Sequence, residues 1–93
     1  MIVRIAEDNQ YEFPDDQADR LNELDNDAVA AVDAGDEDRF HELFESMLEL
    51  VRRDGHRLAD DEIAESDVIL PPPDLSFVEA QRQFTGEGLI PEV

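Results

Sequence analysis

The feature that most constrains the fold is the stretch 16–54, which keeps the apolar spacing of amphipathic helices and is broken once, at Gly35. The first half carries a narrow apolar stripe and the second half a wide apolar face: Leu21, Leu24, Ala28 and Val32, then Phe40, Leu43, Phe44, Met47, Leu50 and Val51. Gly35 suits the left-handed residue that closes a helix, and Asp36 suits the N-cap of the next one. Because only these two residues separate the helices, about 16–34 and 37–54, the sequence predicts an αα-hairpin.

An alternation of apolar and polar residues before this stretch predicts a β-hairpin. The segments 2–5 and 10–13 each place their apolar side chains on one face: Val3, Ile5, Tyr11 and Phe13. Matching the two faces pairs Ile5 with Tyr11 and Val3 with Phe13, which leaves the loop Glu7-Asp8-Asn9. Such loops end in a left-handed residue, and asparagine tolerates that conformation, so Asn9 is expected to adopt it.

After the second helix, the sequence patterns that predict secondary structure span fewer residues. Gly55 is predicted to close that helix in the same left-handed way as Gly35. Within 66–70, the residues Asp67-Val68-Ile69-Leu70 predict a third strand, which three consecutive prolines end. Ser76 and Glu79 have the spacing of a capping box and predict a short helix. Its inward residues are expected to be Phe77, Ala80 and Phe84, with Gly86 at its end.

The order of these elements, ββααβα, defines a small α+β fold. A chain of 93 residues fits one domain, residues 1–93. We expect its core to join the apolar face of the β-hairpin to that of the second helix: Val3, Ile5, Tyr11 and Phe13 against Phe40, Leu43, Phe44 and Met47.

Charge is the strongest signal in the composition. The chain has 26 Asp and Glu against seven basic residues, all of them Arg, for a net charge of −19. Unscreened charges interact over about 10 Å at 0.1 M salt but over only about 3 Å at 1 M. A normally patterned acidic domain without Lys therefore indicates adaptation to high salt. Mimicry of nucleic-acid phosphates by carboxylates is the alternative, and disorder is disfavoured by the helical periodicity.

No residue pattern indicates catalysis, a cofactor or a metal site. The chain lacks cysteine. His41 and Glu42 begin like a zinc-protease motif, but Glu45 stands where the second histidine would be. The acidic runs lack the ligand spacing of a calcium loop. We therefore expect no enzyme and no cofactor, and an unrecognised pair of carboxylates is the remaining enzymatic hypothesis.

The arginines are few, and their positions are informative. Two of them follow an acid by four residues, which predicts the helix ion pairs Asp16–Arg20 and Glu49–Arg53. Three others, Arg52, Arg53 and Arg57 (the first two in the last helical turn), gather around the end of the second helix. They either stabilise the helix C-terminus through its dipole or form a docking point for an acidic partner or a lipid headgroup.

Three parts of the chain together resemble one family. They are Met1-Ile2-Val3-Arg4-Ile5 with Gln10-Tyr11, residues 31–37 continuing to 48–52, and a final part made of 60–62, Ser66-Asp67-Val68-Ile69-Leu70-Pro71, Asp74-Leu75-Ser76 and Glu87-Gly88-Leu89-Ile90-Pro91. This ordered set resembles PspAA, a family of small PspA-associated proteins found in actinobacteria and haloarchaea. The chain departs from that family at Glu7-Asp8-Asn9, where a glycine is usual, and at Phe40 and Phe44, where residues are smaller.

The resemblance implies an accessory protein linked to PspA, a coiled-coil membrane-remodelling protein of the ESCRT-III type that acts in the phage-shock envelope-stress response. It implies no catalytic residues. The leading hypothesis is thus a non-catalytic adaptor that binds a PspA-like protein. The alternatives are an acidic nucleic-acid mimic or transcription-linked inhibitor, and a small enzyme.

The expected partner contacts are the arginines and apolar residues that could face another protein: Arg52, Arg53, Arg57, Val68, Leu70, Leu89 and Ile90. Either the tail caps the core or it meets a partner, and a second copy of the chain, forming a homodimer, is one such partner. Direct nucleic-acid binding is not expected because no basic patch could neutralise phosphates. The chain shows neither a membrane span nor a signal peptide, so we expect it in the cytoplasm, reaching the inner face of the membrane only through its partner.

Overall fold

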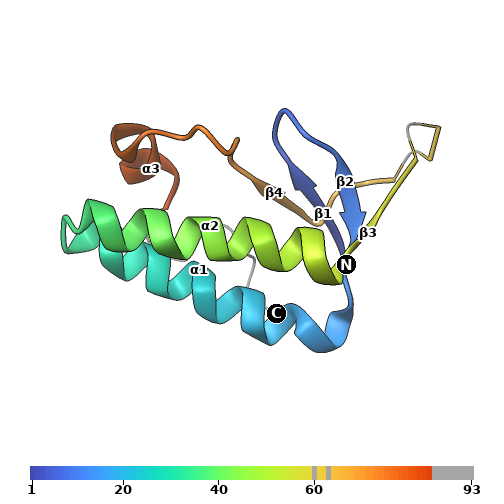
Figure 1. Ribbon diagram of the computed structural model, residues 1–93, viewed down its shortest axis with the longest axis horizontal. Helices are drawn as coiled ribbons and strands as arrows, with labels where there is room; N and C mark the ends of the chain where they lie inside the picture. Colours follow the sequence, from blue (N-terminus) through green and yellow to red (C-terminus); the bar gives the residue numbers. More distant parts are fainter. Residues whose placement is uncertain (60, 63, 85–93) are drawn as a thin grey trace.

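The computed structural model describes residues 1–59, 61–62 and 64–84. Along the chain it contains β1 (Ile2–Ile5), β2 (Gln10–Glu12), the 3-10 helix η1 (Asp15–Gln17), α1 (Ala18–Asp33), α2 (Glu37–Asp54), β3 (His56–Arg57), β4 (Val68–Leu70) and α3 (Phe77–Gln83). The strands of this described part form one sheet in the order β3-β2-β1-β4. As Figure 1 shows, α1 and α2 lie side by side, the sheet lies near one end of this pair, and α3 lies near the other end. The predicted α+β class is confirmed.

The αα-hairpin is confirmed, and its turn follows from two residues. Gly35 has φ +71°, the left-handed conformation expected of it. The amide of Asp36 donates to the Ala31 carbonyl at 2.9 Å, and the amide of Gly35 donates to the Val32 carbonyl at 3.0 Å. These bonds satisfy carbonyls that the end of α1 leaves without helical partners. The Asp36 carboxylate then accepts from the Arg39 amide at 3.1 Å and starts α2 at the predicted residue.

Gly55 also follows a helix, but the prediction that it closes α2 in a left-handed conformation is wrong. Its φ and ψ are −84° and 156°, so the chain passes directly from α2 into the extended strand β3. Glycine is required there for space. A Cβ atom would overlap the Val51 carbonyl oxygen and would lie 3.1 Å from the Tyr11 Cβ. The overlap with the preceding turn of α2 accounts for this glycine first, and the close approach of β2 adds to it.

The β-hairpin forms, but its predicted register is wrong. Tyr11 lies opposite Val3 instead of Ile5, and Ile2 lies opposite Glu12. The turn is Ala6-Glu7-Asp8: the Asp8 amide donates to the Ile5 carbonyl, and Glu7, not Asn9, has the positive φ of 64°. Both registers keep the same side chains on the same face, because sliding a strand by two residues preserves its alternation. The apolar pattern alone therefore cannot distinguish the two registers.

The last two strands complete the sheet on opposite edges. β4 pairs in parallel with β1, with Val68 opposite Val3, and the third-strand prediction is thereby confirmed. β3 was not expected: it pairs with β2, with Arg57 opposite Tyr11. Residues 56 and 57 carry no alternation of their own, so only the adjacent strand makes them extended. His56 thus belongs to the sheet, two residues after the end of α2.

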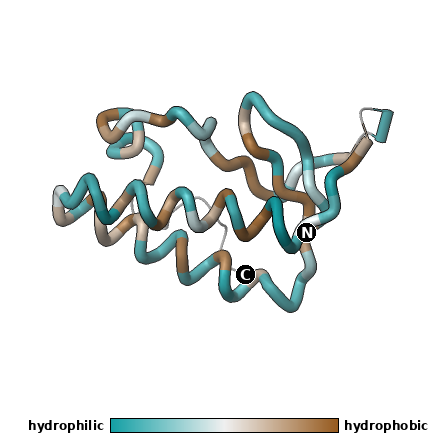
Figure 2. Tube along the Cα trace, in the orientation of Figure 1, coloured by the Kyte–Doolittle hydropathy of each residue, from teal (hydrophilic) through white to brown (hydrophobic). Residues whose placement is uncertain are grey.

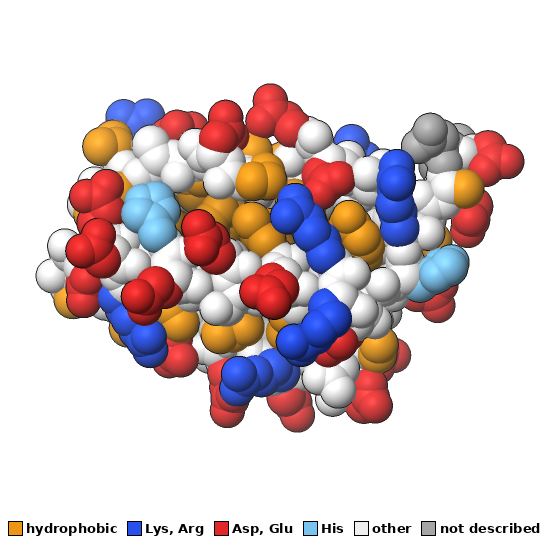
Figure 3. Space-filling model, in the orientation of Figure 1, with side chains coloured by type: hydrophobic (Ala, Val, Ile, Leu, Met, Phe, Trp, Pro, Cys, Tyr) orange, Lys and Arg blue, Asp and Glu red, His pale blue; other side chains and the backbone are white. Residues whose placement is uncertain are grey.

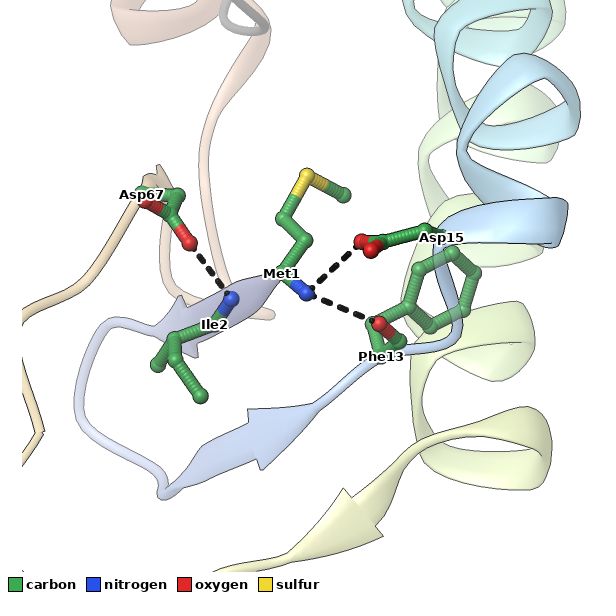
Figure 4. A network of polar contacts seen from close by, with 5 residues as sticks. All are labelled: Met1, Ile2, Phe13, Asp15 and Asp67. Carbon is green, nitrogen blue, oxygen red and sulfur yellow. Dashed lines mark hydrogen bonds and ion pairs between the residues drawn. The ribbon is translucent and has the colours of Figure 1, made fainter.

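Polar contacts hold the start of β1 from two sides (Figure 4). The amino group of Met1 donates to the Phe13 carbonyl at 3.1 Å and to the Asp15 carboxylate at 3.0 Å. On the other side, the Ile2 amide donates to the Asp67 carboxylate at 2.8 Å. These contacts connect β1 to the end of β2 and to the start of β4, segments that are far apart in the sequence.

The predicted core is confirmed. Most buried side chains of the described residues form one cluster that contains both expected sets, Val3, Ile5, Tyr11 and Phe13 with Phe40, Leu43, Phe44 and Met47. Hydrophobic residues recur along α1 and α2 and continue into β1 and β4 (Figure 2). Phe84, after α3, packs edge-on against Phe40 with ring centroids 5.0 Å apart. Ser76 caps α3 as predicted, since its hydroxyl accepts from the Glu79 amide at 3.2 Å, and the same hydroxyl donates to the Glu79 carboxylate at 2.9 Å. Gly86 lies outside the described residues.

Candidate interaction surface

An open groove runs between α2 and the segment that follows β4. Its volume is about 570 Å³, and it is lined by Glu45, Leu48, Glu49, Arg52, Arg53 and Pro73. We call it the α2 groove. Figure 3 shows apolar side chains in the hollow between α2 and the β4–α3 segment, with acidic and basic side chains around it. The groove is thus apolar at its floor and charged at its rim.

Helix geometry and the prolines account for the shape of the groove. Positions 45, 48, 49, 52 and 53 recur every three or four residues and share one face of α2. Leu48 turns inward and keeps only 4% of its surface exposed. Opposite α2, Pro71 is buried and anchors the extended segment, while Pro73 is exposed and forms the second wall. Proline backbone is stiff, so this wall is preorganised.

Charge is ordered along the α2 groove. Glu45 and Glu49 come first along the helix, and Arg52 and Arg53 occupy its last turn. Their place in the last turn suits the helix dipole, which was one of the two sequence interpretations. They also remain accessible, because the Arg52 and Arg53 side chains are 44% and 65% exposed.

Arg52 is held in place by the turn of the β-hairpin. Its Nη2 donates to the Asp8 carboxylate at 2.9 Å. Partial burial raises the pKa of the Asp8 carboxyl, but hydrogen bonds from Arg52 and Asn9 outweigh this effect and hold that pKa below its ordinary value. The same hydrogen bond with Asp8 raises the pKa of Arg52. Asp8 therefore orients the guanidinium at one end of the groove.

The ion pairs expected within the helices differ from those observed. Arg20 pairs with Glu23 at 3.7 Å instead of Asp16, which lies in the 3-10 helix before α1. Arg53 pairs with its neighbour Asp54 at 3.1 Å instead of Glu49. In a surface so rich in carboxylates, several acids lie within reach of each arginine, and sequence spacing does not select among them.

A second, smaller groove of about 160 Å³ adjoins the first on the other side of α2. Its lining includes Arg20, Ser46 and Leu50, and it shares Glu49 and Arg53 with the α2 groove. Arg20, Arg52 and Arg53 therefore line two adjoining hollows together with Glu49.

The residues expected to contact a partner occupy three different environments. Arg52 and Arg53 line the α2 groove, whereas Arg57 lies on the edge strand β3. The side chains of Val68 and Leu70 are 3% and 0% exposed and belong to the core. Between them on β4, Ile69 is 60% exposed and faces outward. Leu89 and Ile90 lie outside the described residues.

Sequence reasoning did not pick out Glu45, Leu48, Glu49, Pro73 or Asp8 as parts of this surface. The helical spacing could have grouped the α2 residues, because they share one face with the two arginines. Nothing in the sequence indicated Pro73 or Asp8, since both reach α2 only through tertiary folding.

The described residues contain no group of three or more His, Cys, Asp or Glu side chains placed to hold a metal ion. His41 is partly exposed, lies 3.8 Å from a Glu37 carboxylate oxygen and packs edge-on against Phe40. None of the helices in the described part is both long and apolar enough to cross a membrane.

The described residues form a small α+β fold with an open, charged groove along α2. The chain belongs to the PspA-associated protein family, PspAA, whose model matches residues 1–92. The resemblance found in the sequence is confirmed, and with it a role linked to PspA in a family of accessory proteins that is not known as an enzyme family. No curated protein and no solved structure gives a significant match to the chain.

Proposed function

We propose that this protein is a non-catalytic adaptor that binds a PspA-like protein through the α2 groove. Membership of the PspA-associated family supports the choice of partner. The observation that carries the choice of surface is the placement of Arg52 and Arg53 beside the apolar floor made by Leu48. These arginines are the exposed cations of the groove in a chain with a net charge of −19.

The shape of the surface favours a helical partner. A helix can lie in an open groove between a helix and an extended segment, burying a few apolar side chains and pairing charges at the rim. The PspA-like partner that the family resemblance implies is a long, charged coiled coil, which offers such helices. A small-molecule substrate would instead be enclosed by a deep pocket with converging polar groups.

The proposal extends to the setting of the interaction. The adaptor acts in the cytoplasm in the envelope-stress response, and it reaches the inner face of the membrane through its partner. Direct nucleic-acid binding is not part of the proposal, because the net negative charge would repel phosphates.

A further part of the proposal is that the acidic surface adapts the protein to high salt. The chain has no Lys, and its acids lie mainly on exposed positions of the described residues. At molar salt the repulsion between these carboxylates is largely screened, while their hydration keeps the protein in solution.

Co-purification of tagged protein with the PspA homologue of the same genome, in high-salt buffer, tests the adaptor function. We expect wild type to retain the homologue and the double variant Arg52→Gln/Arg53→Gln to lose most of it. Arg39→Gln/Arg82→Gln is the matched control, because it removes the same charge from exposed arginines outside the α2 groove. Failure of folded wild type to retain the homologue would contradict the proposed function.

A further inference from the structure

The charges of the α2 groove change sign along its length, and this order restricts which helix can bind in it. Glu45 and Glu49 precede Arg52 and Arg53 along the same face of α2. At 1.5 Å per residue, the centres of the acidic and basic pairs are roughly 8 Å apart along the helix axis. A peptide with charges of only one sign would be attracted to one end of the groove and repelled at the other.

Resting on the proposed function, we infer that the occupant is an amphipathic helix of the PspA-like partner that lies antiparallel to α2. An acidic residue in its N-terminal half faces Arg52 and Arg53, and a basic residue about four to seven positions later faces Glu45 and Glu49. Between them, one apolar side chain rests over Leu48 and against Pro73.

Electrostatics selects the antiparallel direction. The C-terminal end of α2 carries the negative end of its dipole, so the positive N-terminal end of a neighbouring helix is favoured beside it. Within the partner helix, an acid that precedes a base is also the order that stabilises the helix itself. A parallel helix would need the reverse order, with its base before its acid, and would place like dipole ends together.

The preorganised cation at this end supports the same assignment. The hydrogen bond to Asp8 fixes the Arg52 guanidinium at 2.9 Å, and the guanidinium keeps donors for a second carboxylate. Arg53 adds a second exposed guanidinium in the same turn. A partner carboxylate placed here extends existing ion pairs instead of meeting an unpaired, mobile side chain.

A second copy of this chain is the disfavoured occupant. The helix that carries the complementary charges, α2, is itself one wall of the groove and packs on α1. A helix in an extended coiled coil has no such covering along its exposed side.

Disulfide mapping tests the assignment, since the chain has no native cysteine to interfere. Cysteines are introduced singly at Glu45 and Arg53, and at Ala30, an exposed position of α1, as the control. Each variant is oxidised with a series of single-cysteine variants of the PspA homologue. We expect Arg53→Cys to cross-link at partner positions N-terminal to those reached by Glu45→Cys, and Ala30→Cys to form no cross-links.

A second experiment measures affinity after the charges of the two proteins are reversed. Arg52→Glu/Arg53→Glu should weaken binding at least about tenfold, and changing the mapped partner acid to Lys should restore most of that loss. The reverse cross-linking order overturns the antiparallel assignment. Two results overturn the assignment of a PspA-like helix as the occupant. One is intact binding without cross-links at either groove position, and the other is cross-linking between two copies of this chain. Absence of any binding by wild type would instead contradict the proposed function itself.

Discussion

The helical hairpin and the sheet are stabilised by contacts of different range along the chain. The turn between α1 and α2 depends on neighbours: Gly35 closes one helix, and Asp36 caps the other through the Arg39 amide. In the sheet, Val3 lies beside Val68, and the Ile2 amide bonds to the Asp67 carboxylate. The hairpin can therefore begin to form from local signals, whereas the sheet requires distant segments to meet.

The two regions nevertheless share one core. Phe40 and Phe44 of α2 stack at 5.7 Å, and both also pack against Phe84, which follows α3. The side chains of β1 and β2 belong to the same cluster. We therefore expect both regions to unfold together, although only one of them is specified locally.

The largest expected effect comes from salt. On lowering salt from molar concentration to about 0.1 M, we expect helical circular dichroism to be lost, because repulsion between carboxylates then extends over about 10 Å. Near-ultraviolet signals from the Tyr11 region of the sheet should disappear in the same transition. Full helicity in low-salt buffer would contradict the proposed salt adaptation, and loss of the sheet alone would show that the two regions unfold separately.

The next effect tests the shared core. Phe44 is 2% exposed, and Phe44→Ala should lower the free energy of unfolding by about 3–5 kcal/mol through lost burial and a residual cavity. Urea unfolding in high salt, followed by circular dichroism, gives this value. The surface variant Ser46→Ala, on the exposed side of the same helix, serves as the control and should change stability by less than about 1 kcal/mol. If Phe44→Ala lowered the free energy of unfolding as little as Ser46→Ala does, the Phe44 ring would not join the two regions.

Two glycines that follow helices are needed for different reasons, lack of space at Gly55 and a left-handed backbone at Gly35. Gly55→Ala should cost about 3 kcal/mol, because the new methyl group overlaps a backbone oxygen of α2 and approaches Tyr11. Gly35→Ala should cost about 1 kcal/mol for its left-handed backbone alone, since no atom lies within 4 Å of the added Cβ. Paired urea titrations measure the difference. A reversed order would mean that the space beside Gly55 is less restricted than described.

The smallest effect concerns the contact between the β-hairpin turn and α2. The pKa of Asp8 is lowered in the folded state, so its stabilising contribution is present at neutral pH and is lost as pH falls through that lowered pKa. Asp8→Asn should therefore reduce stability by less than about 1 kcal/mol near pH 7, as expected for a partly exposed ion pair. The difference from wild type should shrink toward acidic pH. A difference that is independent of pH would mean that the charge of Asp8 is not what holds Arg52.

Much of the fold could be predicted because its signals are local. Asp36 and Ser76 each accept the amide three residues later, and an N-cap acts within one helical turn. The apolar faces of β1, β2 and α2 were also predictable, because buried side chains recur with the repeat of the backbone, about every two residues in a strand and every three or four in a helix. For the candidate site, the sequence indicated Arg52 and Arg53 but not the groove that they line.

The remaining features could not be read from the sequence for a common physical reason. The β-hairpin register depends on the turn at Glu7, and the apolar pattern is equally satisfied by a strand shifted by two residues. Strand β3 exists because β2 offers free hydrogen-bonding groups beside it. The arginine ion pairs depend on which of many nearby acids the fold brings closest.

By itself, the sequence determined the helices, the faces that they bury and the acidic character of the surface, since each follows from neighbouring residues or from composition. Only the tertiary structure decided the strand order, the parallel placement of β4 beside β1, the approach of β2 to Gly55, and the joining of Asp8, Pro73 and the end of α2 into one surface. These features depend on contacts between residues distant in the chain, whose relative positions are set by the packing of the whole core.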